Sequence, residues 1–145
     1  MNQENTNTLY ERYPRLYQGR TLSLQESQMS WGFACGDGWF ALIDRLSSQI
    51  EAECERMRKE EGWREDQLPI AIQVKEKTGS LRFHLRAQSG AWFIKNETLY
   101  ALVEAARVAS EHTCDSCGGP RIRRAEDEIE TLCDKCSQDM DKSAQ

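Results

Sequence analysis

Two stretches of the sequence repeat apolar residues with the period of an α-helix. In the first, residues 38–59, the apolar positions recur at spacings of three and four: Trp39, Ile43, Leu46, Ile50, Cys54 and Met57. Charged residues fill the other side and Gly62 follows, so we predict a long helix with one buried stripe. In the second, residues 97–112, an alanine-rich pattern follows Asn96, a residue type that caps helix N-termini. We predict a second helix there, packed closely on a neighbour.

Between the helices, the apolar positions alternate with a period of two, which is typical of strands with one buried face. After Pro69, residues 70–75 alternate in this way, and so do residues 81–86. The turn lies between them at residues 77–80, where Gly79 supplies the positive φ that a tight hairpin turn needs. Residues 91–94 are short and apolar, so the antiparallel hairpin has two strands, or three if this segment adds one. The predicted fold class is therefore α+β.

The polar face of the predicted hairpin is basic. It carries Lys75, Lys77, Arg82, His84 and Arg86. Our first interpretation is a solvated outer face, where cations help to keep an antiparallel pair soluble. The alternative is a contact with an anion or a nucleic acid. No aromatic residues are interleaved on this face to stack with bases, which favours the first interpretation.

A stretch rich in glycine and aromatic residues, 31–40, precedes the first helix. Asp37 stands where a helix N-cap is expected, and Gly36 and Gly38 permit a tight turn. Their spacing matches neither of the common phosphate-binding glycine motifs. We therefore favour a capped helix start over a phosphate site or a catalytic role for Asp37.

Four cysteines in the last third of the chain carry the strongest chemical signal. They form two C-x2-C pairs separated by fifteen residues, Cys114 with Cys117 and Cys133 with Cys136. This is the spacing of a closed tetrathiolate zinc site. Four thiolates complete a tetrahedron and leave no position for water or substrate, so we predict one structural Zn²⁺ per chain. Residues 121–124 and 128–132 predict the two short strands of a zinc ribbon.

These elements divide the chain into two parts. Residues 1–112 are predicted to form the α+β domain, with a loose N-terminal arm because residues 1–8 are polar and lack an apolar period. Residues 113–145 are predicted to form the zinc-ribbon module, with a frayed tail from Lys142. The second helix runs almost directly into Cys114, so we expect the module to be fixed to the end of that helix.

Net charge and hydropathy argue against a DNA-coating protein, a membrane protein and a secreted protein. The 145 residues carry a formal net charge of −5, which differs from the basic charge of proteins that coat DNA. No apolar run approaches the roughly 18 residues of a membrane span, and the N-terminus lacks the features of a secretory signal. We therefore expect a cytoplasmic protein with no membrane partner, in a compartment where reduced cysteines favour metal binding over disulfides.

Three blocks of sequence, in this order, resemble a set of small zinc-ribbon-containing proteins of bacteriophages and prophages, whose function is uncharacterised. The blocks are Trp31-Gly-Phe-Ala-Cys-Gly-Asp-Gly-Trp-Phe40, Val74-Lys-Glu-Lys-Thr-Gly-Ser-Leu-Arg-Phe83, and Cys114-x2-Cys-Gly with Leu132-Cys-Asp-x-Cys136. The resemblance covers most of the chain from about Tyr13 onward. It implies a phage-like origin and a bacterial host cytosol, and it supplies no catalytic residues.

Small phage proteins of this size are frequently accessory factors that act on host machinery, including inhibitors of defence systems. No pair of catalytic groups with a defined geometry can be assembled from Asp37, His84 or the scattered carboxylates, so we predict no enzymatic activity. We expect contact with a host protein or protein complex, such as a defence or nucleic-acid-processing system.

The alternative is a nucleic-acid-binding zinc ribbon that uses the basic hairpin face together with Arg121, Arg123 and Arg124. The acidic residues 126–130 lie beside these arginines and would repel phosphate. The alanine-rich second helix also leaves a homodimer open.

Overall fold

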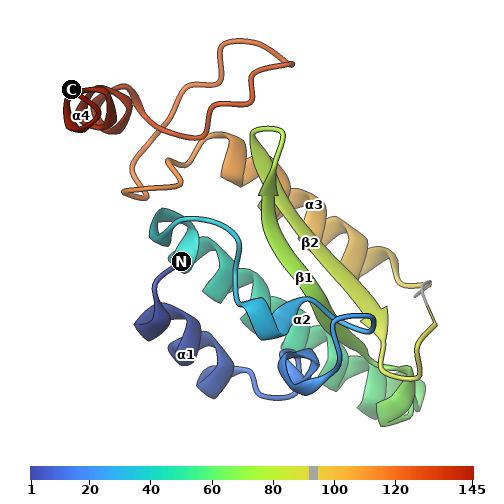
Figure 1. The fold of residues 1–145 in the computed structure, drawn as a ribbon. Helices are drawn as coiled ribbons and strands as arrows, with labels where there is room; N and C mark the ends of the chain where they lie inside the picture. The colour runs from blue at the N-terminus through green and yellow to red at the C-terminus, as the bar shows by residue number, and fades with distance from the viewer. Residues whose placement is uncertain (92–94) are drawn as a thin grey trace.

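The computed structural model describes residues 1–91 and 95–145. Its helices and strands are α1 (Gln3–Arg12), α2 (Phe40–Glu61), β1 (Pro69–Lys77), β2 (Ser80–Ala87), α3 (Glu97–Glu111) and α4 (Asp134–Ser143) (Figure 1). Short 3-10 helices lie at Gln18–Thr21, Met29–Trp31, Asp37–Trp39 and Glu65–Gln67. The predicted α+β class is confirmed. Residues 92–94, which make up most of the candidate third strand, lie outside the described residues.

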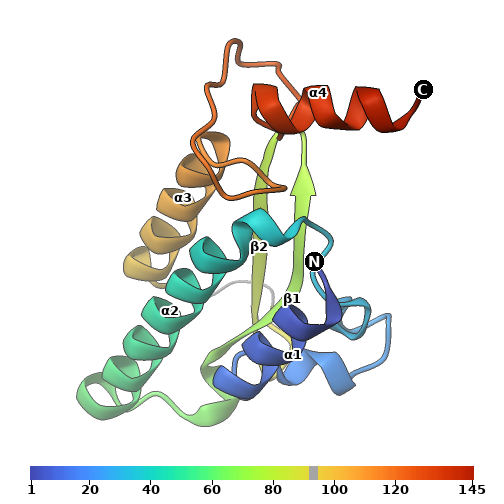
Figure 2. The ribbon, with the colours of Figure 1, turned by 90° about the vertical axis from the view of Figure 1, so that its left-hand side faces the viewer.

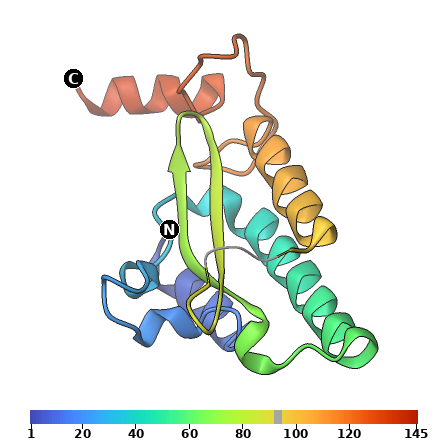
Figure 3. The same cartoon turned by 90° about the vertical axis from the view of Figure 1, so that its right-hand side faces the viewer.

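The hydrophobic core lies between α2, α3, the hairpin and the N-terminal segment, which adds Leu9, Leu16, Tyr17, Met29 and Phe33. The apolar stripe predicted for α2 is buried, with Ile43, Ile50 and Met57 fully enclosed. Val74, Leu81 and Phe83 of the hairpin belong to the same cluster. Figures 2 and 3 show α2 and α3 side by side next to the hairpin, and α4 beyond the hairpin turn.

The boundaries of α2 differ slightly from the prediction. The helix begins at Phe40, after a 3-10 turn at Asp37–Trp39, and ends at Glu61. Gly62 follows with a φ of 70°, the left-handed conformation in which helices commonly end on glycine. The sequence therefore located this helix and its terminating glycine.

The hairpin pairs antiparallel from Lys77 opposite Ser80 to Pro69 opposite Ala87. Thr78 and Gly79 have φ values of 51° and 82°, so the predicted positive φ at Gly79 is confirmed. Two consecutive residues with positive φ give a turn whose twist suits the two strands. The register shifts between Ala71 and Gln73, which interrupts the simple alternation.

Arg86 is not part of the exposed basic face. Only 8% of its surface is accessible, because both faces of the sheet are covered near the base of the hairpin. The consecutive residues Ile70 and Ala71 point to opposite faces, yet both are buried. The N-terminal segment covers this end: Leu16 O accepts a 2.8 Å hydrogen bond from Ala71 N.

The N-terminal residues form a helix, which corrects the prediction of a loose arm. The Asn2 side chain caps α1 by accepting a hydrogen bond from Asn5 N at 2.8 Å. Only Thr6 and Leu9 of this helix are buried. The remaining positions are mostly polar, so the sequence offers too short an apolar stripe to reveal the helix.

Helix α3 agrees with the prediction of residues 97–112 to within one residue. The Asn96 side chain caps it by accepting from Leu99 N at 2.8 Å. Of its alanines, Ala106 is buried in the core, whereas Ala101, Ala105 and Ala109 are exposed. The close packing expected of this helix therefore involves only one of its alanines.

Candidate metal centre

The four cysteines predicted as metal ligands come together at one point. The Sγ atoms of Cys114, Cys117, Cys133 and Cys136 all lie within 4.8 Å of one another. The Sγ atoms of Cys117 and Cys133 are 3.8 Å apart. In a tetrahedral site with sulfur about 2.3 Å from Zn²⁺, neighbouring sulfurs are about 3.8 Å apart. The cluster therefore has the dimensions of a site for one metal ion.

Residues 114–119, which we call the knuckle, hold the first cysteine pair. Cys114 N donates to Gly119 O at 2.8 Å, and Gly118 turns the chain with a φ of 74°. Two backbone N–H groups point at sulfur: Gly119 N lies 3.4 Å from Cys117 Sγ, and Cys133 N lies 3.3 Å from Cys114 Sγ. Such donors stabilise thiolate charge and orient metal ligands.

The acid–base behaviour of the cluster favours a cation at its centre. Burial opposes ionisation of Cys114, but backbone N–H groups outweigh it and lower the pKa of the thiol to about 7. Hydrogen bonds with the Cys133 and Cys117 thiols raise the pKa of Cys136 to about 12. Thiolates this close repel one another, so they ionise together only around a cation. Metal binding must therefore release protons, and affinity must fall as the pH is lowered.

The two cysteines outside the cluster, Cys35 and Cys54, are not reactive thiols. Burial raises the pKa of Cys35 to about 12 and that of Cys54 to about 11. Both thiols are therefore protonated at neutral pH and are poor nucleophiles.

The second cysteine pair lies at the start of α4. Cys133 occupies the N-cap position and Cys136 lies in the first turn. Free N–H groups and the helix dipole at this end favour thiolate charge. Helix α4 continues to Ser143, so Lys142 and Ser143, the first half of the tail expected to fray, are helical.

The two ribbon strands predicted at residues 121–124 and 128–132 do not form. Across residues 113–133, all of which the structure describes, the β-pairing is limited to one bridge between Thr113 and Pro120. We call residues 120–132 the arm. Arginine side chains, in place of a backbone ladder, satisfy carbonyl groups along it.

Arg121 is the central support of the arm. Its side chain is buried, donates to Glu111 O at 2.6 Å and to Glu130 O, and lies 3.6 Å from a carboxylate oxygen of Glu128. These contacts tie both halves of the arm to the end of α3. Arg121 is therefore a structural residue, and its guanidinium is not presented to a nucleic acid.

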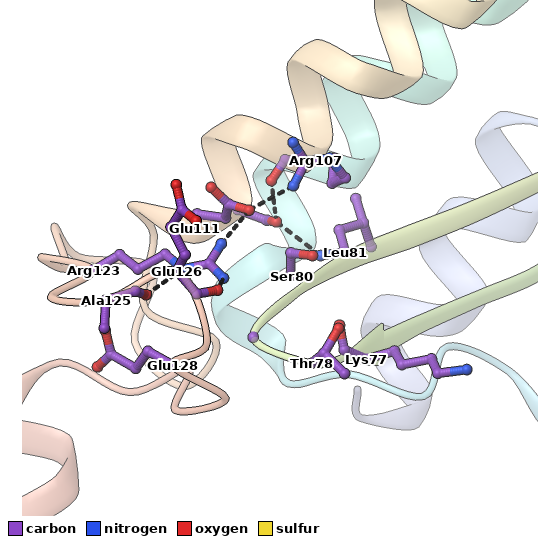
Figure 4. A network of polar contacts seen from close by, with 12 residues as sticks. Lys77, Thr78, Ser80, Leu81, Arg107, Glu111, Arg123, Ala125, Glu126 and Glu128 are labelled. Carbon is purple, nitrogen blue, oxygen red and sulfur yellow. Dashed lines mark hydrogen bonds and ion pairs between the residues drawn. The ribbon is translucent and has the colours of Figure 1, made fainter.

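The other two arginines of the arm are also engaged within the fold. Arg123 forms an ion pair with Glu111 and donates to Ala125 O at 3.0 Å (Figure 4). Burial works against ionisation of Glu111, but Arg123 and Arg107 hold the pKa of its carboxyl below its usual range. Arg124 pairs with Asp134 at 2.6 Å.

Replacing Arg121 by alanine should release the arm and lower the free energy of unfolding by about 2 kcal/mol, because buried carbonyl groups lose charged donors. Arg124→Ala is the matched control, since its ion pair is exposed and should contribute less than about 1 kcal/mol. Urea unfolding at 25 °C measures both variants. Equal losses for the two would show that Arg121 does not support the arm.

Residues 35–39, which we call the socket, hold the knuckle from the other side. Gly36 N donates to Asp115 Oδ1 at 2.6 Å, and Gly38 N donates to Asp115 O at 2.8 Å. The indole Nε1 of Trp39 donates to Thr113 O at 2.8 Å. The glycines predict a tight turn here but not its contact with the knuckle, because the knuckle lies more than seventy residues further along the chain.

The two glycines of the socket are required by close backbone contact. A Cβ atom on Gly36 would lie closer than 3.0 Å to Asp115 O. A Cβ atom on Gly38 would lie closer than 3.0 Å to Cys114 O and 2.5 Å from Gly118 N. Neither glycine has the positive φ that would otherwise explain it. No larger residue fits while the knuckle stays in place.

Asp37 does not cap α2 as predicted. Its Oδ1 instead accepts from Asn2 N at 2.8 Å and from Asn5 Nδ2 at 3.1 Å, which fastens the start of α1 to the socket. These hydrogen bonds, the Asn2 N–H first, lower the pKa of the Asp37 carboxyl. Asp37 is therefore a structural link between α1 and the socket.

The hairpin turn supports the arm from a third direction. A Cβ atom on Gly79 would lie closer than 3.0 Å to Glu128 O, so the turn touches the arm backbone directly. Nearby, Leu81 N donates to Ser110 Oγ of α3 at 2.8 Å (Figure 4). The cysteine-bearing segment is thus fixed to the end of α3, as expected, and also to the socket and to the hairpin turn, which the sequence did not indicate.

The remaining four basic residues of the hairpin lie together, and we call them the hairpin face: Lys75, Lys77, Arg82 and His84. Partial burial, and then the charges of Lys75, Arg82 and Lys77, lower the pKa of His84. Arg82 donates to the hydroxyl groups of Ser80 and Thr78. Lys75 and Lys77 form no ion pair with the carboxylates of the described chain.

Comparisons with models of protein families, with curated proteins and with solved structures find no match to this chain. None of the helices within the described residues is both long enough and apolar enough to cross a membrane.

Proposed function

We propose that this chain is a binding protein without enzymatic activity, which contacts a host protein or protein complex in the cytoplasm. The resemblance to phage and prophage proteins supports a bacterial host, and a defence or nucleic-acid-processing system as the target. In this proposal the cysteine cluster binds one Zn²⁺, because thiolate ligands in a tetrahedral arrangement suit that ion. Four protein ligands close the coordination sphere, so the metal acts as a brace.

The observation that carries the proposal is the exposure of two large aliphatic side chains on a fixed backbone. Ile122 is 79% exposed and Ile129 is 73% exposed, and both belong to the arm. Arg121, the hairpin turn and the cysteine cluster hold that backbone. Apolar groups presented this way are typical of protein contacts, since a backbone ordered in advance loses little entropy on binding.

Nucleic-acid binding is the second candidate, supported by the hairpin face alone. Partial burial is the largest cause of the lowered His84 pKa, and the charges of Lys75, Arg82 and Lys77 lower it further, which indicates a local positive potential. The arm arginines do not extend this surface, since all three are bonded within the fold. Binding of this kind should weaken steeply with added salt and be abolished by Lys75→Glu with Lys77→Glu.

Affinity capture from a nuclease-treated bacterial lysate tests the proposal. We expect a defined protein or complex to be retained after the nucleic acid is destroyed, and no shift of DNA or RNA in a gel at low salt. A chain that stays alone in the treated lysate would contradict the proposal. A gel shift that disappears with Lys75→Glu and Lys77→Glu would favour the second candidate instead.

A further inference from the structure

The arm has a definite internal arrangement, with one exposed isoleucine on each of the two halves of the loop. Arg121 links to Glu130 O, and Arg124 N donates to Glu128 Oε2 at 2.6 Å. In the sequence, Ile122 lies between Arg121 and Arg124, and Ile129 lies between Glu128 and Glu130. The two side chains therefore belong to facing halves of one cross-linked loop.

A cavity adjoins Ile122, between the arm and the start of α4. Its volume is about 360 Å³, and its apolar lining includes Pro120, Ile122 and Leu132. Glu130 and Lys135 line it as well. A cavity of this size, next to an exposed isoleucine, is large enough to receive a side chain of a partner.

The charged lining of the cavity is balanced, with Arg121, Arg124 and Lys135 against Glu128, Glu130 and Asp134. The arm's own charges that lack an ion pair among the residues that the structure describes are negative. The ion pairs of the three arm arginines go to Glu128, Glu111 and Asp134, which neutralises the arginines. Glu126, Asp127 and Glu130 are exposed, and no cation of the described chain forms an ion pair with them. Four thiolates around one divalent cation would add a further net negative charge.

We propose that the arm is the recognition surface, and that it docks on a basic protein surface whose apolar side chain enters the cavity beside Ile122. This inference rests on the proposed function. Charge complementarity selects the partner class: Lys or Arg residues at the rim of the contact match the unpaired carboxylates of the arm. A nucleic acid is repelled by the same carboxylates.

Site-specific photocrosslinking tests the inference. The photoreactive amino acid p-benzoylphenylalanine replaces Ile122 or Ile129, and a bacterial lysate supplies the partner. The control position is Trp31, which is equally exposed at 79% but lies in the N-terminal part of the chain. We expect one protein to be crosslinked from both arm positions and not from position 31. The crosslinked peptides should come from a surface rich in Lys and Arg.

Two pairs of variants separate charge from apolar contact. Glu126→Lys with Asp127→Lys should reduce the captured protein by at least about tenfold at low salt, and Ile122→Ser with Ile129→Ser by at least about thirtyfold. Glu4→Lys with Glu11→Lys reverses two exposed carboxylates on α1 and should leave capture unchanged. Metal content and thermal midpoint verify that each variant is folded.

The outcomes distinguish this inference from the function on which it rests. If the unmodified chain captures no protein, the proposed function itself fails. If it captures a protein that the arm variants do not affect, the function stands and the arm is not the recognition surface. A crosslink from Ile122 to a second copy of this chain, or to nucleic acid, would also overturn the inference.

Discussion

Removing the metal ion is expected to disorder residues 113–145 and to lower the thermal midpoint of the protein by at least about 10 °C. Within this segment only Cys114 and Arg121 are buried. So small a core does not stabilise a fold alone, and we expect metal coordination to supply the missing free energy. The socket loses its partner at the same time, so α1 and the start of α2 are destabilised too.

Cys114→Ser with Cys117→Ser reproduces metal removal without a chelator. Metal analysis and thermal unfolding, followed by amide hydrogen exchange of the arm, measure the effect. Cys35→Ala and Cys54→Ala are the controls, because they remove the two thiols outside the cluster and should retain full metal content. Undiminished metal in the Cys114 and Cys117 variant would contradict the assignment of these ligands.

Replacing Gly38 by alanine is expected to lower the free energy of unfolding by about 3 kcal/mol, the upper part of the range for overpacking. The new Cβ atom would press on Cys114 O and Gly118 N, which are backbone atoms that cannot rotate aside. Socket and knuckle must then separate, and metal should dissociate faster. Urea unfolding and the rate of metal transfer to a coloured chelator measure the two effects.

Gly62→Ala provides the comparison for this variant. Gly62 has a φ of 70° but open space around its Cβ position, so alanine there should cost only about 1 kcal/mol of backbone strain. Metal transfer should not change. If Gly38→Ala is no more destabilised than Gly62→Ala, the close contact between socket and knuckle is not important for stability.

The sequence predicted those parts of the fold that depend on local periodicity. The stripe of α2, the hairpin turn at Gly79 and the Asn96 cap of α3 are all confirmed. The four cysteines also meet, because C-x2-C spacing reflects the geometry of the metal site itself. Each of these features is decided by spacing within one element or within one C-x2-C pair.

The features that the sequence did not predict depend on contacts between distant segments. Gly36 and Gly38 contact the knuckle, which lies more than seventy residues away in the sequence. The residues next to these glycines do not indicate that contact. Arg121 and Arg86 were expected on the surface because arginine usually lies there, yet both are buried. Arg121 is buried because carbonyl groups of α3 and of the arm accept its hydrogen bonds.

Two helices escaped prediction for a related reason. Helix α4 has no buried residues, and α1 has only Thr6 and Leu9, so neither shows an apolar stripe. The signals that were present are polar ones. Asp134 in the first turn of α4 and Lys142 in its last turn suit the helix dipole, and Asn2 caps α1.

The central claim is that four cysteines hold one Zn²⁺ as a closed structural site beneath a protein-binding arm. X-ray absorption at the zinc edge, combined with metal analysis of the purified chain, tests the metal part of that claim most directly. We expect one zinc per chain, surrounded by four sulfur atoms at about 2.3 Å. Fewer than four sulfurs, or a nitrogen or oxygen ligand in their place, would contradict it.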